Sequence, residues 1–102
     1  NCTNLSEIYA NEGSNGTGAG GICGKYAARG KDSSGNTWNT TALTISGCTN
    51  EGKITGYGSG TSGGGGILGS NAFYGNSSAS TITDCHNTGE INGGGGGGIV
   101  GS

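Results

Sequence analysis

Three segments of this 102-residue chain repeat one pattern of residue types. Each segment has a cysteine, an asparagine two positions later and an isoleucine four positions after the asparagine, and the segments begin at Cys2, Cys48 and Cys85. Each is followed, after a glycine-rich stretch, by Gly-Gly-Ile-x-Gly, at 20–24, 65–69 and 97–101. Repetition of this kind predicts an array in which structural units stack and each unit contacts only its neighbours.

The composition favours β-structure without a conventional globular core. Only 28% of the residues are hydrophobic, whereas the chain contains 27 glycines and no proline. The isoleucines nevertheless recur in fixed register, and β-branched residues at fixed spacing are typical of stacked strands. No window places apolar residues at i, i+3, i+4 and i+7, whereas short alternating runs bounded by glycine and asparagine are common. We therefore expect an all-β fold with little or no helix.

Short strands, frequent turns and strict repetition predict a parallel β-solenoid. If each repeated phrase occupies one coil, the chain forms four to five short coils; one wide coil per unit, with long loops, is the other possible count. We expect residues 1–102 to form a single array with units 1–47, 48–84 and 85–102, the third of them partial. The first unit is longer mainly because of Lys31–Thr41, a predicted loop insertion that carries Trp38.

Stacking predicts that equivalent residues form columns with a spacing of about 4.8 Å. The predicted ladder residues are Cys2, Cys48, Cys85, Asn4, Asn50, Asn87, Ile8, Ile54, Ile91, Ile22, Ile67 and Ile99. The asparagine side chains should hydrogen-bond to one another or to corner backbone groups, and the isoleucines should form a thin apolar core. Glu7, Lys53 and Glu90 should form a column of alternating charge that faces solvent.

The four cysteines favour an oxidising compartment. We expect a disulfide within the column of Cys2, Cys48 and Cys85, and a reduced Cys23 in the core. There is no close cysteine pair of the kind that zinc sites use, so we expect no metal and no cofactor. Five acceptor sequons for N-glycosylation also favour an extracellular or cell-surface location, and they begin at Asn1, Asn4, Asn15, Asn39 and Asn76.

Charge and hydropathy disfavour two classes of partner. Charged residues make up 10% of the chain, the formal net charge is −2 and no basic stripe is present, so we expect no nucleic-acid binding. No apolar run approaches the length of a membrane span, so we expect no membrane insertion. The chain contains no methionine, and we therefore expect a processed product or part of a longer protein.

Several phrases of the chain resemble a known repeat family. Gly-Gly-Ile-Leu-Gly at 65–69, Thr-Ile-Thr-Asp-Cys at 81–85 and Cys-Thr-Asn-Glu-Gly-Lys-Ile-Thr-Gly at 48–56 resemble the GLUG-type or "GGIVG" repeats of bacterial surface proteins. The resemblance covers most of the chain. It implies a β-solenoid that serves as a stalk or adhesin segment and carries no catalytic residues. The long first unit and Cys23 depart from the family pattern.

We therefore expect a non-catalytic structural segment of an extracellular surface fibre or adhesin stalk. Its partners would be other copies of itself, stacked end to end into filaments or laterally, or neighbouring repeats of a longer chain. The alternative is a carbohydrate-binding module that contacts surface glycans through an aromatic strip. The candidate contact residues of this module are Tyr26, Phe73, Tyr74 and Trp38.

A polysaccharide-cleaving β-helix enzyme is a third hypothesis. Such an enzyme needs two carboxylates on one face, and the candidates are Glu7, Asp84 and Glu90. Neither the column of Glu7 and Glu90 nor the proximity of Asp84 to His86 is accompanied by a groove of polar and aromatic residues. We therefore expect solvated surface carboxylates and assign no catalytic residue.

Overall fold

The computed structural model describes residues 1–10, 18–32, 34–37, 41–56, 63–92 and 96–101. Within these ranges there is no helix, and regular structure consists of short strands. The strands are β1 (Thr3–Asn4), β2 (Ile8–Tyr9), β3 (Thr44–Ser46), β4 (Thr49–Asn50), β5 (Ile54–Thr55), β6 (Thr81–Thr83), β7 (His86–Asn87) and β8 (Ile91–Asn92). The prediction of an all-β chain is confirmed for this part of the molecule.

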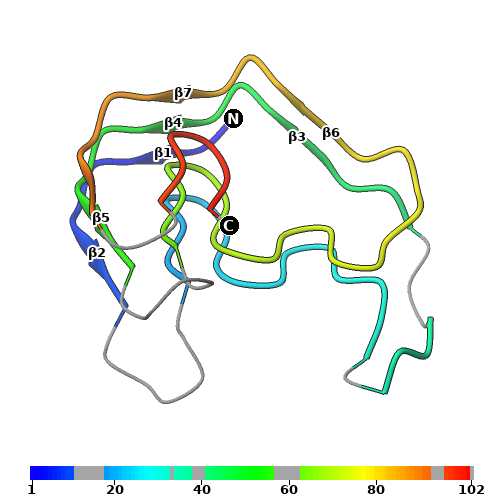
Figure 1. Ribbon diagram of the computed structural model, residues 1–102. Helices are drawn as coiled ribbons and strands as arrows, with labels where there is room; N and C mark the ends of the chain where they lie inside the picture. The colour runs from blue at the N-terminus through cyan, green and yellow to red at the C-terminus, as the bar shows by residue number, and fades with distance from the viewer. Residues whose placement is uncertain (11–17, 33, 38–40, 57–62, 93–95, 102) are drawn as a thin grey trace.

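All strand pairs are parallel and join one unit to the next (Figure 1). Two sheets have three strands, in the orders β1-β4-β7 and β2-β5-β8, and a third consists of β3 and β6. The strands pair without a register shift, so Asn50 lies between Asn4 and Asn87. Ile54 lies in the same way between Ile8 and Ile91. The repeated residues therefore become columns.

The Gly-Gly-Ile-x-Gly segments stack in the same way. Parallel bridges connect Gly20, Gly65 and Gly97 in one series, and Cys23, Leu68 and Val100 in another. Hydrogen bonds run from the Ile22 amide to the Ile67 carbonyl (3.0 Å) and from the Ile67 amide to the Ile99 carbonyl (2.9 Å). The three isoleucines of this phrase are thus also placed one above another.

The spacing of the stack corrects the expected number of coils. Each three-stranded sheet takes one strand from each unit, so stacking repeats once per unit and gives three layers. This differs from the four to five short coils expected and has the spacing of the alternative count, one repeat of the stack per unit. The phrases of one unit instead lie on different sides of the same layer (Figure 1). The Cys-x-Asn phrase of the first unit, for example, forms β1 and β2 in two different sheets, so a phrase supplies sides of a layer and not a complete coil. The principal extents of 35 × 33 × 15 Å describe a flat stack.

Asn4, Asn50 and Asn87 form a column, which we call the asparagine column, at the corner between the sheets β1-β4-β7 and β2-β5-β8. The Asn50 side chain is fully buried. Its Nδ2 donates to the Gly52 carbonyl at 2.8 Å and to Asn87 Oδ1 at 2.7 Å, and its Oδ1 accepts from Asn4 Nδ2 at 2.8 Å. A buried amide with these partners fixes both the corner within a layer and the contact between layers.

The core lies mainly in the middle unit. The buried cluster consists of Ile45, Cys48, Ile67 and Leu68, and the side chains packed around it come from all three units. Leu68 is completely buried, whereas Val100, its neighbour in the third layer, is 37% exposed. The middle layer is covered on both sides, and each outer layer is covered on one.

The predicted charge column is present at the surface. Lys53 Nζ lies 3.9 Å from Glu90 Oε2, and the two side chains are 44% and 64% exposed. Glu7 is also exposed and precedes Ile8, the partner of Ile54. An exposed ion pair of this kind stabilises a fold by only about 0–1 kcal/mol, so its main effect is on the preference for one register.

Candidate functional site

Two equivalent turns, at 25–30 and 70–75, build the most distinctive surface of the molecule. Their backbones follow the same unusual course, with positive φ at Tyr26 (65°) and Ala28 (55°) and at the equivalent Asn71 (55°) and Phe73 (63°). Hydrogen bonds between the layers hold the turns together, from the Tyr26 amide to the Ser70 carbonyl (3.1 Å) and from the Phe73 amide to the Ala27 carbonyl (2.7 Å). The left-handed conformation is costly for residues with a Cβ atom, so these turns depend on their stacked partner.

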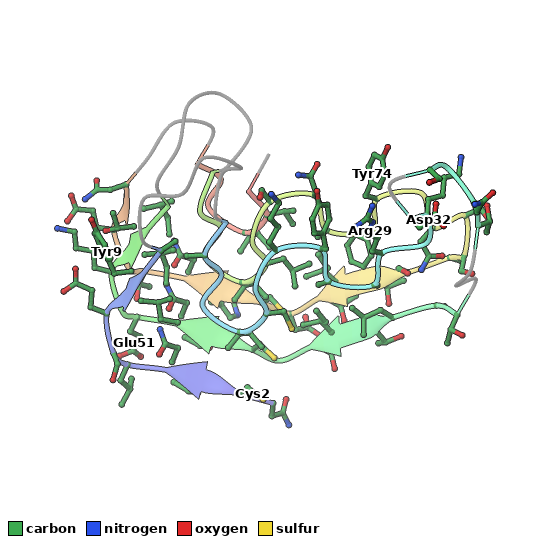
Figure 2. All side chains as sticks on the ribbon, turned by 90° about the horizontal axis from the view of Figure 1, so that it is seen from below. Cys2, Tyr9, Arg29, Asp32, Glu51 and Tyr74 are labelled. Carbon is green, nitrogen blue, oxygen red and sulfur yellow. The ribbon has the colours of Figure 1, made fainter. Side chains whose placement is uncertain are left out.

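The side chains of these turns bring two tyrosines and an arginine together. The Arg29 guanidinium carbon lies 4.4 Å from the ring centroid of Tyr26 and 5.7 Å from that of Tyr74. Lys25 Nζ lies 4.8 Å from the Tyr26 ring centroid. Tyr26 is 37% and Tyr74 51% exposed, and Figure 2 shows Arg29 and Tyr74 on the same side of the molecule. We call Lys25, Tyr26, Arg29 and Tyr74 the Tyr-Arg surface.

Positive charge is concentrated in this region. Three of the four Lys and Arg residues of the whole sequence lie between positions 25 and 31, although the formal net charge of the chain is −2. Each cation that lies over a tyrosine ring is stabilised by the negative face of that ring. The Tyr-Arg surface therefore combines exposed aromatic area with cations, a chemistry suited to sugars that carry acidic groups.

The structure corrects the predicted aromatic strip. Tyr26 and Tyr74 both lie near Arg29, but Phe73 is partly buried and packs against the core cluster. Trp38 lies outside the described residues. Arg29, which was not predicted, lies between the tyrosines. Alignment of the two turns would have revealed it, because Arg29 occupies in the first unit the place of Tyr74 in the second.

A small loop closed by Asp32 adjoins this surface. Asp32 Oδ1 accepts hydrogen bonds from the amides of Ser34 and Asn36, both at 2.9 Å, and Lys31 and Thr37 form an antiparallel bridge. The Asn36 amide contributes most to lowering the pKa of the Asp32 carboxyl, and the Asn36 side chain, the Ser34 amide and the charge of Arg29 lower it further. The described part of the predicted Lys31–Thr41 insertion is thus an ordered turn.

All four cysteines are described, and all four are free thiols, so the predicted disulfide is absent. The Cys48 thiol instead donates to the Ser46 carbonyl at 3.5 Å, and Cys85 donates to the Thr83 carbonyl at 3.3 Å. In-register side chains on parallel strands point in the same direction, which disfavours the geometry of a disulfide. Cys23 is partly buried beside the core cluster, and burial, followed by the proximity of Cys48 and Cys2, raises the pKa of its thiol.

The carboxylates considered for hydrolysis lie at the surface. Glu90 faces Lys53, and Glu7 and Asp84 are exposed. Asp84 occupies a corner with a φ of 51°, equivalent to Gly47 in the preceding layer. The described residues include no group of three or more His, Cys, Asp or Glu side chains arranged to hold a metal ion.

Within the described part of the chain, no helical segment has the length and hydrophobicity that a bilayer-spanning helix requires. Comparisons with protein-family models, with curated proteins and with solved structures find no match for the chain.

Proposed function

We propose that this chain is a non-catalytic structural segment, a β-solenoid with one wide coil per unit that gives length and rigidity to an extracellular surface fibre or adhesin stalk. The observation that carries the proposal is the asparagine column, in which Asn4, Asn50 and Asn87 hydrogen-bond in series. The resemblance of the repeats to those of bacterial surface proteins supports the same role.

The repeated residues join one layer to the next. Asparagine and isoleucine recur in every unit, and in the stack they lie beside their own equivalents in the adjacent layers. Each layer therefore presents the next with the same pattern of donors, acceptors and apolar side chains. A stack held by such columns is stiff along its axis and extends by adding layers.

The stacking itself is tested by NMR on the unmodified 9.7 kDa chain. We expect nuclear Overhauser contacts between Thr3 and Thr49 and between Thr44 and Thr81, which are register partners. We expect none between Thr3 and His86, which are two layers apart. Contacts confined to residues within one unit would refute the stacked architecture.

The mechanical role is tested by single-molecule force spectroscopy with the chain held between two reference domains. A stalk segment should resist force and lengthen in steps that correspond to the release of whole units. Extension without a force peak, in a chain whose NMR contacts are intact, would exclude a load-bearing role.

The Tyr-Arg surface supports a second candidate function, the binding of glycans that carry carboxylate groups. Exposed tyrosine faces stack on sugar rings, and the cations of positions 25–31 would attract the carboxylates. The test is a glycan array probed with the chain and with Tyr74→Ala. Tyr9→Ala is the matched control, because Tyr9 is a similarly exposed tyrosine on β2. An absence of acidic glycans among the hits, or hits unaffected by Tyr74→Ala, would exclude this function.

A further inference from the structure

The asparagine column has a direction. Asn4 Nδ2 donates to Asn50 Oδ1 at 2.8 Å, and Asn50 Nδ2 donates to Asn87 Oδ1 at 2.7 Å. The same nitrogens also donate within their own layers, to the carbonyls of Ser6, Gly52 and Gly89. Each amide therefore uses one N–H for its own corner and passes the other to the next layer, always from the first unit towards the third.

The two ends of the column are consequently different and complementary. An asparagine amide has two N–H groups, and Asn87 donates to the Gly89 carbonyl at 3.0 Å with no second acceptor among the described residues. At the other end, Asn4 Oδ1 accepts from the Ser6 amide at 3.2 Å. In Asn50 and Asn87 the equivalent oxygen accepts an amide from the preceding layer. One end of the column offers a donor where the other offers an acceptor.

The backbone hydrogen bonds between layers also make the two ends different and complementary, although their donors point from the later layer to the earlier one, opposite to the asparagine side chains. The amides of Thr49 and Glu51 donate to the carbonyls of the first layer at 2.8 and 2.9 Å, and the amides of His86 and Thr88 donate to those of the second, both at 2.9 Å. The groups that would continue the series are the amides of Thr3 and Leu5, in or just after the edge strand β1, and the carbonyls of Cys85 and Asn87, just before or in the edge strand β7. Figure 2 shows β1, which follows the labelled Cys2, at one edge of the stack and β7, in orange, beyond the green β4.

The apolar columns also stop at the outer layers. Ile54 is completely buried, whereas Ile8 and Ile91 above and below it are only partly buried. Val100 in the third layer is 37% exposed, whereas Leu68, its equivalent in the middle layer, is completely buried. Another layer of the same kind would cover these side chains as the middle layer is already covered.

We propose that a second copy of the chain stacks head to tail on the first, so that its β1 pairs with β7, its β2 pairs with β8 and its Asn4 accepts the second amide hydrogen of Asn87. This inference rests on the proposed structural function, because it extends the same columns across a junction between molecules. The contact is heterologous: the two surfaces differ, so each added copy leaves a new donor end and the association continues as a filament.

One column opposes this junction. Inside the chain Lys53 separates Glu7 from Glu90, but stacking places Glu90 of one copy beside Glu7 of the next. Like charges in adjacent positions of a sheet are destabilising. The two carboxylates therefore limit association at low salt, and removal of either charge strengthens it.

The polarity is tested with two variants that each block one end. Asn87→Asp keeps an acceptor for the Asn50 amide and removes the outward donor, whereas Leu5→Pro removes the Leu5 amide hydrogen. We expect each variant alone to associate roughly tenfold more weakly than the wild type, because a junction hydrogen bond is lost. Mixed together, they should form heterodimers in sedimentation velocity, since each retains the end that the other lacks.

Matched controls separate these effects from misfolding. Leu5→Ala retains the amide hydrogen, and Thr88→Asp adds a negative charge beside an intact Asn87; both should assemble like the wild type. Each variant is used only if it shows the Overhauser contacts between Thr44 and Thr81. Self-association of Asn87→Asp as tight as that of the wild type would overturn the polarity, and dispersed wild-type monomers with intact contacts would overturn the junction while leaving the solenoid in place.

The carboxylates of Glu7 and Glu90 at the junction provide an independent test. Glu90→Gln and Glu7→Gln should strengthen association at low salt by roughly two- to fivefold, the range expected for an exposed charge pair. Glu51→Gln makes the same charge change in the middle layer and should have no effect. An equal response of all three variants, or none of any, would contradict the register of the junction.

Discussion

Asn50 is the residue whose replacement most directly tests the asparagine column. Asn50→Ala removes two donated hydrogen bonds and one accepted bond from a fully buried position. One N–H of Asn4, Asn87 Oδ1 and the Gly52 carbonyl each lose the hydrogen bond that Asn50 supplied, while Asn4 keeps its bond to the Ser6 carbonyl. A typical hydrogen bond contributes about 1 kcal/mol, and an unsatisfied buried group costs about 1–3 kcal/mol, so we expect the free energy of unfolding to fall by about 3–5 kcal/mol.

Asn87→Ala is the internal comparison. This residue makes two of the equivalent bonds, one donated to Gly89 and one accepted from Asn50, and it is only partly buried. Water can replace its partners, so we expect a loss of about 1–2 kcal/mol. The assay is urea denaturation followed by circular dichroism, with the free energies compared at equal m-values.

The decisive measurement is the difference between the two variants in the free energy of unfolding. If Asn50→Ala and Asn87→Ala cost the same, or if both cost less than about 1 kcal/mol, the series of side-chain bonds does not hold the layers together. Asn50→Asp gives a second reading, because it keeps the acceptor but buries a charge. Burial raises the pKa of such a carboxyl in the folded state, so its destabilising effect should be full at neutral pH and should decrease on acidification.

Three further predictions concern single positions. Gly66→Ala should destabilise the fold by about 3 kcal/mol or more in thermal denaturation, because a Cβ atom there would lie 2.5 Å from Asn87 Cγ, whereas the equivalent Gly98→Ala has open space and should be nearly neutral. Asp84→Gly should be more stable than Asp84→Ala by about 1 kcal/mol in urea denaturation, because the φ of 51° suits glycine; equal stabilities would contradict the left-handed corner. The Asp32 carboxyl should titrate below the range of an exposed aspartate when followed through the Asn36 amide by NMR. The stabilisation of the loop by the ionised Asp32 carboxylate should be present above the unfolded-state pKa and lost as the pH falls through the lower folded-state pKa. A titration in the ordinary range would exclude the hydrogen bonds from Ser34 and Asn36 to this carboxylate.

The repeated residues predicted the contacts between units better than the course of the chain within a unit. Identical residues at equivalent places stack most easily with each other, so the pairing of Ile8 with Ile54 and of Asn50 with Asn87 follows from the repeat itself. The sequence left two counts open, four to five short coils or one wide coil per unit, because a two-residue strand such as β4 gives no periodicity that distinguishes a corner from a complete coil.

The candidate surface was predicted in part for a related reason. Tyr26 and Tyr74 could be grouped by aligning the two turns, but the inward direction of Phe73 depends on a left-handed backbone at a non-glycine residue. Residue type gives no warning of that conformation, since phenylalanine rarely adopts it. The absence of a disulfide has a similar origin, because the direction of the cysteine side chains is set by the parallel register and not by the number of cysteines.

The unequal covering of the three layers has a consequence for how stability depends on the number of units. In a one-dimensional lattice, each internal layer makes two interfaces and each terminal layer makes only one. The free energy of folding per layer therefore becomes more favourable as layers are added, because the interfaces missing at the two ends are a smaller share of the total. The fully buried Leu68 and the partly exposed Val100 are the same position under these two conditions. Unfolding should therefore begin by fraying at the outer units, and duplication of a unit within a gene would increase cooperativity without any new type of contact.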